Sequence, residues 1–273
     1  MIIDGKKVAS SVREEVKKEV ARIYPKPRLL VIQVGEDPAS CTYIKSKEKA
    51  CLEVGIEFYH KKYDANVKQE VLEEEITRFN DDNRISGILI QLPLPKHLDT
   101  QRLIDLISPQ KDVDGLTTVN LGLLFQNREG IVPCTPLGIV RLLHEYNIEI
   151  AGKDVVIVGR SNLVGKPLSM LFLKENATVT ICHSKTKNLS DKTKEADILI
   201  VAVGKKHLIT KEMVKDGAVV IDVGITREDG KLYGDVDFED VKDKASYITP
   251  VPGGVGPMTV SMLLSNFVKT RKE

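Results

Sequence analysis

The sequence is poor in cysteine, and it contains neither a CxxC pair nor an HExxH motif. Five histidines are scattered without metal-ligand spacing, and the four cysteines are Cys41, Cys51, Cys134 and Cys182. This pattern excludes a zinc finger and a disulfide framework, and it is typical of reduced thiols in the cytoplasm. We therefore expect a cytoplasmic protein without a metal site.

An excess of one charge and long apolar runs are also missing. Lys and Arg total 40 against 39 Asp and Glu, so the net charge of +1 predicts no general attraction to nucleic acid or to an anionic membrane. The first residues lack the apolar core of a signal peptide, and runs such as 198–203 are too short to cross a bilayer. With 42% hydrophobic and 29% charged residues, the chain is predicted to fold around an ordinary core.

Two kinds of apolar pattern alternate along the chain. Strands, most of them continuous apolar runs as in buried parallel sheets, are predicted at 28–34, 56–60, 86–92, 154–159, 178–182, 197–203 and 218–223. Apolar residues three or four apart predict helices at 8–23, 38–54, 67–80, 100–107, 165–175 and 258–269. The alternation predicts an α/β protein whose second α/β unit begins after residues 133–136 and is closed by a Pro- and Gly-rich segment, 250–257.

A glycine loop joins the strand at 154–159 to the next helix. Gly159 permits a tight turn and Gly165 permits close approach of the helix, whose N-terminus can then hold a phosphate. Ser161 stands where the usual dinucleotide fingerprint has a glycine, so the motif is a variant. The loop predicts a Rossmann-like unit.

The following strand indicates which dinucleotide binds. NAD enzymes usually carry an acidic residue about 20 positions after the loop, for the ribose hydroxyls. Here the strand is followed by Ser184 and Lys185 instead. Because Ser184 can donate to a phosphate and Arg160 and Lys185 add positive charge, we predict NADP rather than NAD. The alternative is that both cations are ordinary solvated surface charges.

Four polar positions in the first half are candidates for chemistry. Tyr43 and Lys47 lie four apart on one predicted helix and can face one pocket, although neighbouring lysines also fit a solvated helix face. Gln91 ends a predicted strand, where ligands of α/β units gather, or else caps a loop. Asp114 precedes a glycine, as in an ordinary turn, but its carboxylate also complements the donor edge of an amino-pyrimidinone.

Six segments distributed over the whole chain resemble one enzyme family when they are taken together and in order. They are YIKSK (43–47), GILIQLPLP (87–95), KDVDG (111–115), PCTP (133–136), GRSNLVGKP (159–167) and PVPGGVGPMT (250–259). The family is that of the bifunctional methylenetetrahydrofolate dehydrogenases/methenyltetrahydrofolate cyclohydrolases. Any one segment could arise by chance, but six in order are highly specific.

The resemblance implies a fold, an activity and partners. It implies a tetrahydrofolate-binding domain at 1–134, a Rossmann-like NADP domain at 135–257, and a last segment, 258–273, that packs back on the first domain. It implies a homodimer formed through the cofactor domains. The implied reactions are the NADP-dependent oxidation of 5,10-methylenetetrahydrofolate to 5,10-methenyltetrahydrofolate and its hydrolysis to 10-formyltetrahydrofolate.

The resemblance also implies roles for individual residues. Lys47 matches the catalytic lysine, Tyr43 the tyrosine that stacks on folate, Gln91 the partner of the lysine, and Asp114 the acid that anchors the pterin. The implied cofactor contacts are Gly159, Arg160, Ser161, Gly165, Ser184, Lys185 and Ile225, and further substrate contacts are Gly256, Pro257 and Thr259. Because the methenyl product is a cation that disfavours a protonated lysine nearby, we expect Lys47 to accept a proton from the attacking water.

Two other readings share much of this pattern. One is a two-domain NADP dehydrogenase of another small substrate, such as shikimate or an amino acid, and the other is a non-catalytic nucleotide sensor. The segments at 111–115 and 250–259 favour folate over the first, and the presence of Lys47 argues against the second. A short-chain dehydrogenase also has a YxxxK pair, but downstream of its cofactor loop rather than upstream.

Overall fold

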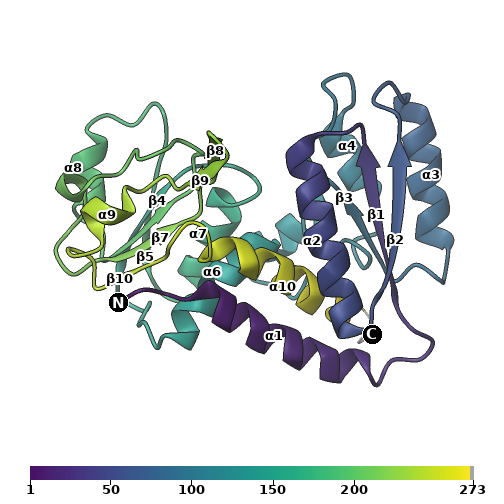
Figure 1. The fold of residues 1–273 in the computed structure, drawn as a ribbon, viewed down its shortest axis with the longest axis horizontal. Coiled ribbons are helices and arrows are strands. Elements are labelled where there is room, and N and C mark those ends of the chain that lie inside the picture. The colour runs from purple at the N-terminus through teal and green to yellow at the C-terminus, as the bar shows by residue number, and fades with distance from the viewer. Residues whose placement is uncertain (271–273) are drawn as a thin grey trace. The chain divides into compact units, whose positions relative to one another are not determined.

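A computed structural model describes residues 1–270, and the chain divides into two compact α/β units (Figure 1). The first unit consists of Ser10–Cys134 and the chain from Val260 onward. The second unit consists of Met1–Ala9 and Thr135–Thr259. Residues 271–273, the end of the predicted return segment, lie outside the described residues.

The first unit is built on a three-stranded parallel sheet with the strand order β2-β1-β3. Alternate residues of β1 pack with α3 and α4 in one apolar cluster, and α2 lies on the other side of the sheet (Figure 1). All strands run parallel, so their carboxyl ends meet at one edge of the sheet. The elements are β1 (Arg28–Val34), α2 (Pro38–Val54), β2 (Glu57–Tyr63), α3 (Gln69–Asp81), β3 (Gly87–Ile90), α4 (Thr100–Asp105) and α5 (Thr118–Phe125).

The second unit is built on a five-stranded parallel sheet with the order β10-β7-β6-β4-β5. The chain leaves β4 toward β5 on one side and continues with β6 on the other, so the strand order reverses at β4. This reversal is where doubly wound sheets bind their ligands. The elements are α6 (Cys134–Glu145), β4 (Asp154–Val158), α7 (Gly165–Lys174), β5 (Thr178–Cys182), α8 (Leu189–Thr193), β6 (Ile198–Val201), η1 (Lys211–Met213), β7 (Val219–Asp222), β8 (Thr226–Glu228), β9 (Lys231–Tyr233), α9 (Phe238–Val241) and β10 (Tyr247–Ile248).

Two helices cross from one unit to the other, α1 (Gly5–Val20) and α10 (Val255–Lys269). The last helix begins three residues earlier than the apolar pattern predicts, inside the Pro- and Gly-rich segment. Pro257 is tolerated there because the first turn of a helix needs no N–H donor. Among the described residues, no helix combines the length and apolar character needed to cross a membrane.

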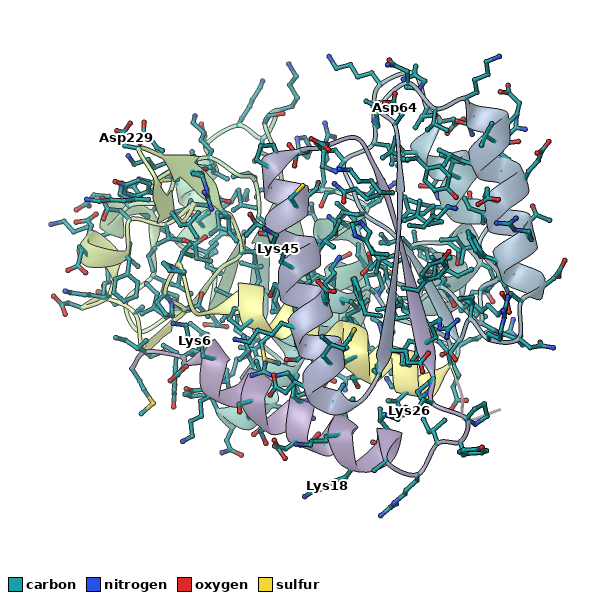
Figure 2. All side chains as sticks on the ribbon, turned by 45° about the vertical axis from the view of Figure 1, so that its right-hand side comes forward. Lys6, Lys18, Lys26, Lys45, Asp64 and Asp229 are labelled. Carbon is teal, nitrogen blue, oxygen red and sulfur yellow. The ribbon has the colours of Figure 1, made fainter. Side chains whose placement is uncertain are left out.

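The sequence pattern missed α5, α6 and the β8–β9 hairpin. The α5 segment is apolar on most sides, so it lacks the periodicity that marks a helix. The hairpin turns at Asp229 and Gly230, whose φ angles are 50° and 75°. Two positive φ angles are typical of the tight turn that joins antiparallel strands, and Figure 2 labels Asp229 at this turn.

Candidate active site and cofactor loop

Helix α2 carries the predicted lysine on its buried face. The helix begins after Asp37, whose carboxylate accepts the Ser40 N–H at 2.7 Å, and it ends at Gly55 with a φ of 87°. Lys47 is only 8% exposed, whereas Lys45, labelled on the same helix in Figure 2, is exposed. Burial of one lysine among several on this helix favours a specific role for it.

Lys47 is held by Gln91, the first residue after β3. The Lys47 Nζ donates to Gln91 Oε1 at 2.9 Å, and both side chains are buried. The amide group of Gln91 donates in turn to the Leu92 carbonyl oxygen at 2.8 Å. Because the amide nitrogen has its own acceptor, the amide oxygen is directed at the lysine. The structure therefore brings together two residues 44 positions apart, as the sequence analysis predicts.

Tyr43 lies one helical turn before Lys47 on α2, and its side chain is 41% exposed. A half-exposed ring at this place is free to stack on a planar ligand. The predicted neighbours on the helix are therefore a buried amine and an accessible aromatic ring.

The two acids of the KDVDG turn differ in burial and in their hydrogen bonds. Asp112 is 1% exposed, and its carboxylate accepts the backbone N–H groups of Gly115 and Thr117 at 2.9 and 2.8 Å and the Asn120 amide at 2.9 Å. These bonds use Asp112 to build the turn. The ordinary turn chemistry considered for this segment therefore applies to Asp112, whose carboxylate makes the hydrogen bonds of the turn.

Asp114 is half-buried beside the lysine. Desolvation by burial raises the pKa of the Asp114 carboxyl, and the charge of Asp112 acts in the same direction, while Lys47 and a hydrogen bond from the Cys134 thiol oppose the rise. Cys134, at the start of α6, is itself positioned by Asn266 of α10, whose amide lies 3.5 Å from its sulfur. A half-buried carboxylate with few protein donors is suited to accept N–H groups from a ligand.

In the second unit, two glycines bring the backbone of the loop after β4 very close to its neighbours. A Cβ atom on Gly159, whose φ is 136°, would lie 2.4 Å from the Ala202 carbonyl oxygen, and one on Gly165 would lie 2.1 Å from the Gly159 oxygen. Glycine is therefore required at both positions. No side chain caps the N-terminus of α7, where the preceding residue is Val164, so this end can accept an anion.

The predicted phosphate-binding side chains lie on the loops that follow two neighbouring strands, β4 and β5. The Gly159 N–H donates to the Cys182 oxygen at 2.8 Å, so the loops after β4 and β5 begin side by side. Arg160, Ser184 and Lys185 are exposed on these loops, and neither cation has a carboxylate partner among the described residues. The close glycine loop, the free helix end and two unpaired cations fit a dinucleotide with an additional phosphate.

The remaining predicted positions lie in the second unit. Ile225, three residues after β7, is 40% exposed, and its Cδ1 would be 3.9 Å from a Cβ atom on Gly256. Gly256 and Pro257 lie in the first turn of α10, and the Thr259 hydroxyl is 2.9 Å from that of Thr135. Ser161 is exposed, and its hydroxyl accepts the Val164 N–H at 3.1 Å.

Two buried acids in the second unit were missed from the sequence. Asp222 ends β7 and is 3% exposed, and Asp235 is fully buried. The signal that could have revealed them is a glycine close to each, Gly224 and Gly234. Acidic residues next to glycines are so common in turns that this signal alone indicates only a turn.

Comparisons with known proteins agree with this arrangement. Two family models match the chain, the catalytic domain of tetrahydrofolate dehydrogenase/cyclohydrolase over residues 3–114 and its NAD(P)-binding domain over residues 133–273. A Campylobacter hominis protein named bifunctional protein FolD is 54% identical over 275 residues, which cover 99% of this chain and 97% of the relative.

Two solved structures have closely similar folds. The bifunctional FolD enzyme of Campylobacter jejuni has a TM-score of 0.97 and 48% identity, covering 100% of this chain and 98% of that one. The Trypanosoma brucei methylenetetrahydrofolate dehydrogenase-cyclohydrolase, solved with NADP and an inhibitor, has a TM-score of 0.95 and 41% identity, covering 100% and 97%.

Proposed function

Because this chain belongs to the tetrahydrofolate dehydrogenase/cyclohydrolase family, we propose that Lys47, Gln91 and Asp114 carry out its chemistry on folate. The chain is a bifunctional enzyme of one-carbon metabolism. It oxidises 5,10-methylenetetrahydrofolate to 5,10-methenyltetrahydrofolate with NADP and hydrolyses this product to 10-formyltetrahydrofolate. The observation that carries the residue assignment is the buried Lys47–Gln91 hydrogen bond of 2.9 Å.

The oxidation moves a hydride from the methylene carbon to the nicotinamide of NADP, which is the chemistry that the cofactor supplies. The protein contributes mainly by holding the reacting atoms in place. Asp114 accepts N–H groups of the amino-pyrimidinone ring, and Tyr43 stacks on the planar part of the substrate. Further substrate contacts are assigned to Gly256, Pro257 and Thr259.

The cofactor contacts belong to the second unit. The backbone around Gly159, Ser161 and Gly165 holds the diphosphate at the start of α7, and the side chains after β4 and β5 hold the 2′-phosphate. Ile225 contacts the cofactor from the loop after β7. We accordingly assign folate binding to residues 1–134 with 258–273, and NADP binding to residues 135–257.

The hydrolysis adds water to the methenyl carbon. Gln91 accepts one N–H of Lys47, which directs the rest of the amino group away from the amide. We assign to Lys47 the role of the base that takes a proton from the attacking water. The hydroxyl group of the adduct then gives up its proton and becomes the formyl C=O, while the bond between this carbon and N5 breaks and N5 takes up a proton, so the formyl group remains on N10.

The first test combines wild-type enzyme with two lysine variants. Lys47→Met should lose at least ~100-fold of the hydrolysis, since general-base catalysis contributes 10²–10⁴-fold. Lys45→Met is the matched control, because Lys45 is exposed on the same helix, and it should retain both activities. Full hydrolysis by Lys47→Met would remove the lysine from the mechanism, and wild-type turnover only with NAD would overturn the cofactor assignment.

The assembly and the location belong to the same proposal. A homodimer formed through the second unit is supported by β5, an edge strand with an open outer side and an exposed Ile181 (37%). A cytoplasmic location is supported by four cysteines that form no disulfide within the described residues. Light scattering of the purified chain and fractionation of cells test the two statements.

A further inference from the structure

Two carboxylates are buried in the second unit away from the residues assigned above. Asp222 is the last residue of β7 and is 3% exposed, and Asp235 precedes α9 and is fully buried. Buried carboxylates are costly unless they are well hydrogen-bonded, so their partners show what they hold.

Asp235 binds three consecutive backbone amides of the loop after β6. Its Oδ2 accepts the N–H groups of Val203 and Gly204 at 2.7 and 3.0 Å, and its Oδ1 accepts that of Lys205 at 2.6 Å. All three loop residues are exposed, whereas the carboxylate beneath them is inaccessible. The protein's own anion therefore occupies the concave set of amides in which a loop of this kind could hold a phosphate.

Asp222 holds Asp235 in the same manner. The Oδ1 atom of Asp222 accepts the Asp235 N–H and its Oδ2 accepts the Val236 N–H, both at 2.9 Å. The backbone N–H of Asp222 donates to the Thr249 hydroxyl at 2.7 Å. The two acids thus form a chain of contacts from the end of β7 to the loop after β6.

Each carboxylate fills the space over a glycine. A Cβ atom on Gly224 would lie 2.0 Å from the carboxyl carbon of Asp235, and one on Gly234 would lie 1.9 Å from the Asp222 Oδ2. No side chain fits at either position without displacing an acid. This packing explains why glycine is needed at both positions. It also connects the loop after β7, which contains Gly224 and Ile225, to the loop after β6, because Asp235 contacts both loops.

The order of the strands tells which part of a dinucleotide these loops face. The phosphate loop follows β4, and the side chains suited to the 2′-phosphate follow β4 and β5 on one side of the reversal. The strands β6 and β7 lie on the other side of β4. The opposite half of a dinucleotide, which carries the nicotinamide, therefore extends over the loops after β6 and β7.

We infer that Asp235, held by Asp222, is a positioning residue for the nicotinamide half of NADP, an inference that rests on the proposed function. The acid acts through the loop backbone and touches neither cofactor nor substrate. Because Asp235 already accepts the backbone N–H groups of the loop after β6, the diphosphate is expected to bind at the Gly159–Gly165 loop instead.

The test replaces Asp235 by Asn, which presents an NH₂ group to amides that need an acceptor. NADPH should bind this variant ~10–100-fold more weakly, as expected for lost charge-assisted hydrogen bonds. Hydrolysis of supplied 5,10-methenyltetrahydrofolate, which needs no NADP, should change less than about twofold. The matched control is Asp197→Asn, because Asp197 accepts the Asp154 N–H at the opposite ends of the strands, and NADPH affinity should be unchanged.

NADPH binding by Asp235→Asn with wild-type affinity would overturn the inference, and so would an equal loss in Asp197→Asn. If Asp235→Asn does not fold, amide exchange in the unliganded wild-type protein decides. The amides of Val203, Gly204 and Lys205 should exchange at least ~100-fold more slowly than the exposed Asp229–Gly230 turn, because they are bonded to a buried acceptor. Exchange at the rate of that turn would overturn the inference, whereas wild-type enzyme inactive with NADP would instead refute the proposed function.

Discussion

Replacing Gln91 by Glu should strongly slow the hydrolysis and spare the oxidation. The Gln91 Oε1 lies 2.9 Å from the Lys47 Nζ, and each residue is 8% exposed. A carboxylate oxygen there would attract the protonated lysine by about 6 kcal/mol at an effective dielectric constant of 20. Desolvation of the new charge offsets part of this attraction. If half remains, about 3 kcal/mol, the neutral lysine needed as a base becomes roughly 100-fold rarer.

The assay measures the two reactions separately. Hydrolysis is followed as loss of absorbance from supplied 5,10-methenyltetrahydrofolate, and oxidation as NADPH formation. Gln91→Glu should hydrolyse at least ~100-fold more slowly, because general-base catalysis contributes 10²–10⁴-fold, and oxidation should continue at nearly the wild-type rate. Gln91→Met is the control that removes the acceptor without adding a charge, and it should lose only ~10-fold.

Two results would refute this reasoning. Hydrolysis at the wild-type rate in Gln91→Glu would mean that the neutral form of Lys47 is not required. An equal loss of both activities would mean that the substitution damages folate binding rather than proton transfer.

Three further predictions concern the other acids and the cofactor loop. Asp114→Asn should weaken folate binding ~10–100-fold. In the wild type, kcat/KM should fall as the pH drops through the raised pKa of Asp114, and this acidic limb should be missing in the variant. An unchanged pH profile would contradict the anchor role. Lys185→Glu should raise the KM for NADP by ~10-fold or more and leave that for NAD nearly constant, because a carboxylate repels the 2′-phosphate. Burial raises the pKa of Asp222 to about 7 from 3.8, with the Asp235 charge adding to the rise and backbone hydrogen bonds from Val236, Asp235 and Gly224 opposing it. Between pH 3.8 and about 7 the folded state keeps this proton while the unfolded state releases it. The contribution of Asp222 to the free energy of unfolding should therefore fall by about 4 kcal/mol across that window and then level off. Urea unfolding of Asp222→Asn should lack this dependence on pH.

Elements with a clear apolar pattern could be predicted closely, both in the buried strand β1 and in the largely exposed edge strand β5. The runs at 28–34 and 178–182 and the helix at 38–54 have the same bounds in the structure as in the sequence pattern. Segments with weak periodicity were missed, since α5 is apolar nearly all round and the β8–β9 hairpin is only three residues long on each side. A helix is revealed by its local pattern only when one face differs clearly from the other, and a strand only when its apolar run is long enough to stand out.

The candidate site shows why residue type predicts less than environment. Lys45 and Lys47 are two positions apart on α2, and Asp112 and Asp114 share one turn, so nothing local separates the members of either pair. The structure separates them through distant partners, such as Gln91, 44 positions from Lys47. The resemblance to a family could select Lys47 and Asp114, whereas the burial of Asp235 beneath a loop 30 residues away has no counterpart in local sequence.

The two reactions make different demands on the chain, and this difference allows the assignments to be tested as a set. Both reactions act on the same carbon of the folate, so Asp114 and Tyr43 should serve both. Lys47 and Gln91 serve the hydrolysis, because only that step needs a base for water. Residues of the loops after β4, β5 and β7 hold NADP and therefore serve the oxidation alone. A variant in the cofactor loops that slows hydrolysis of supplied methenyl substrate as much as oxidation would argue against this division, whatever its effect on stability.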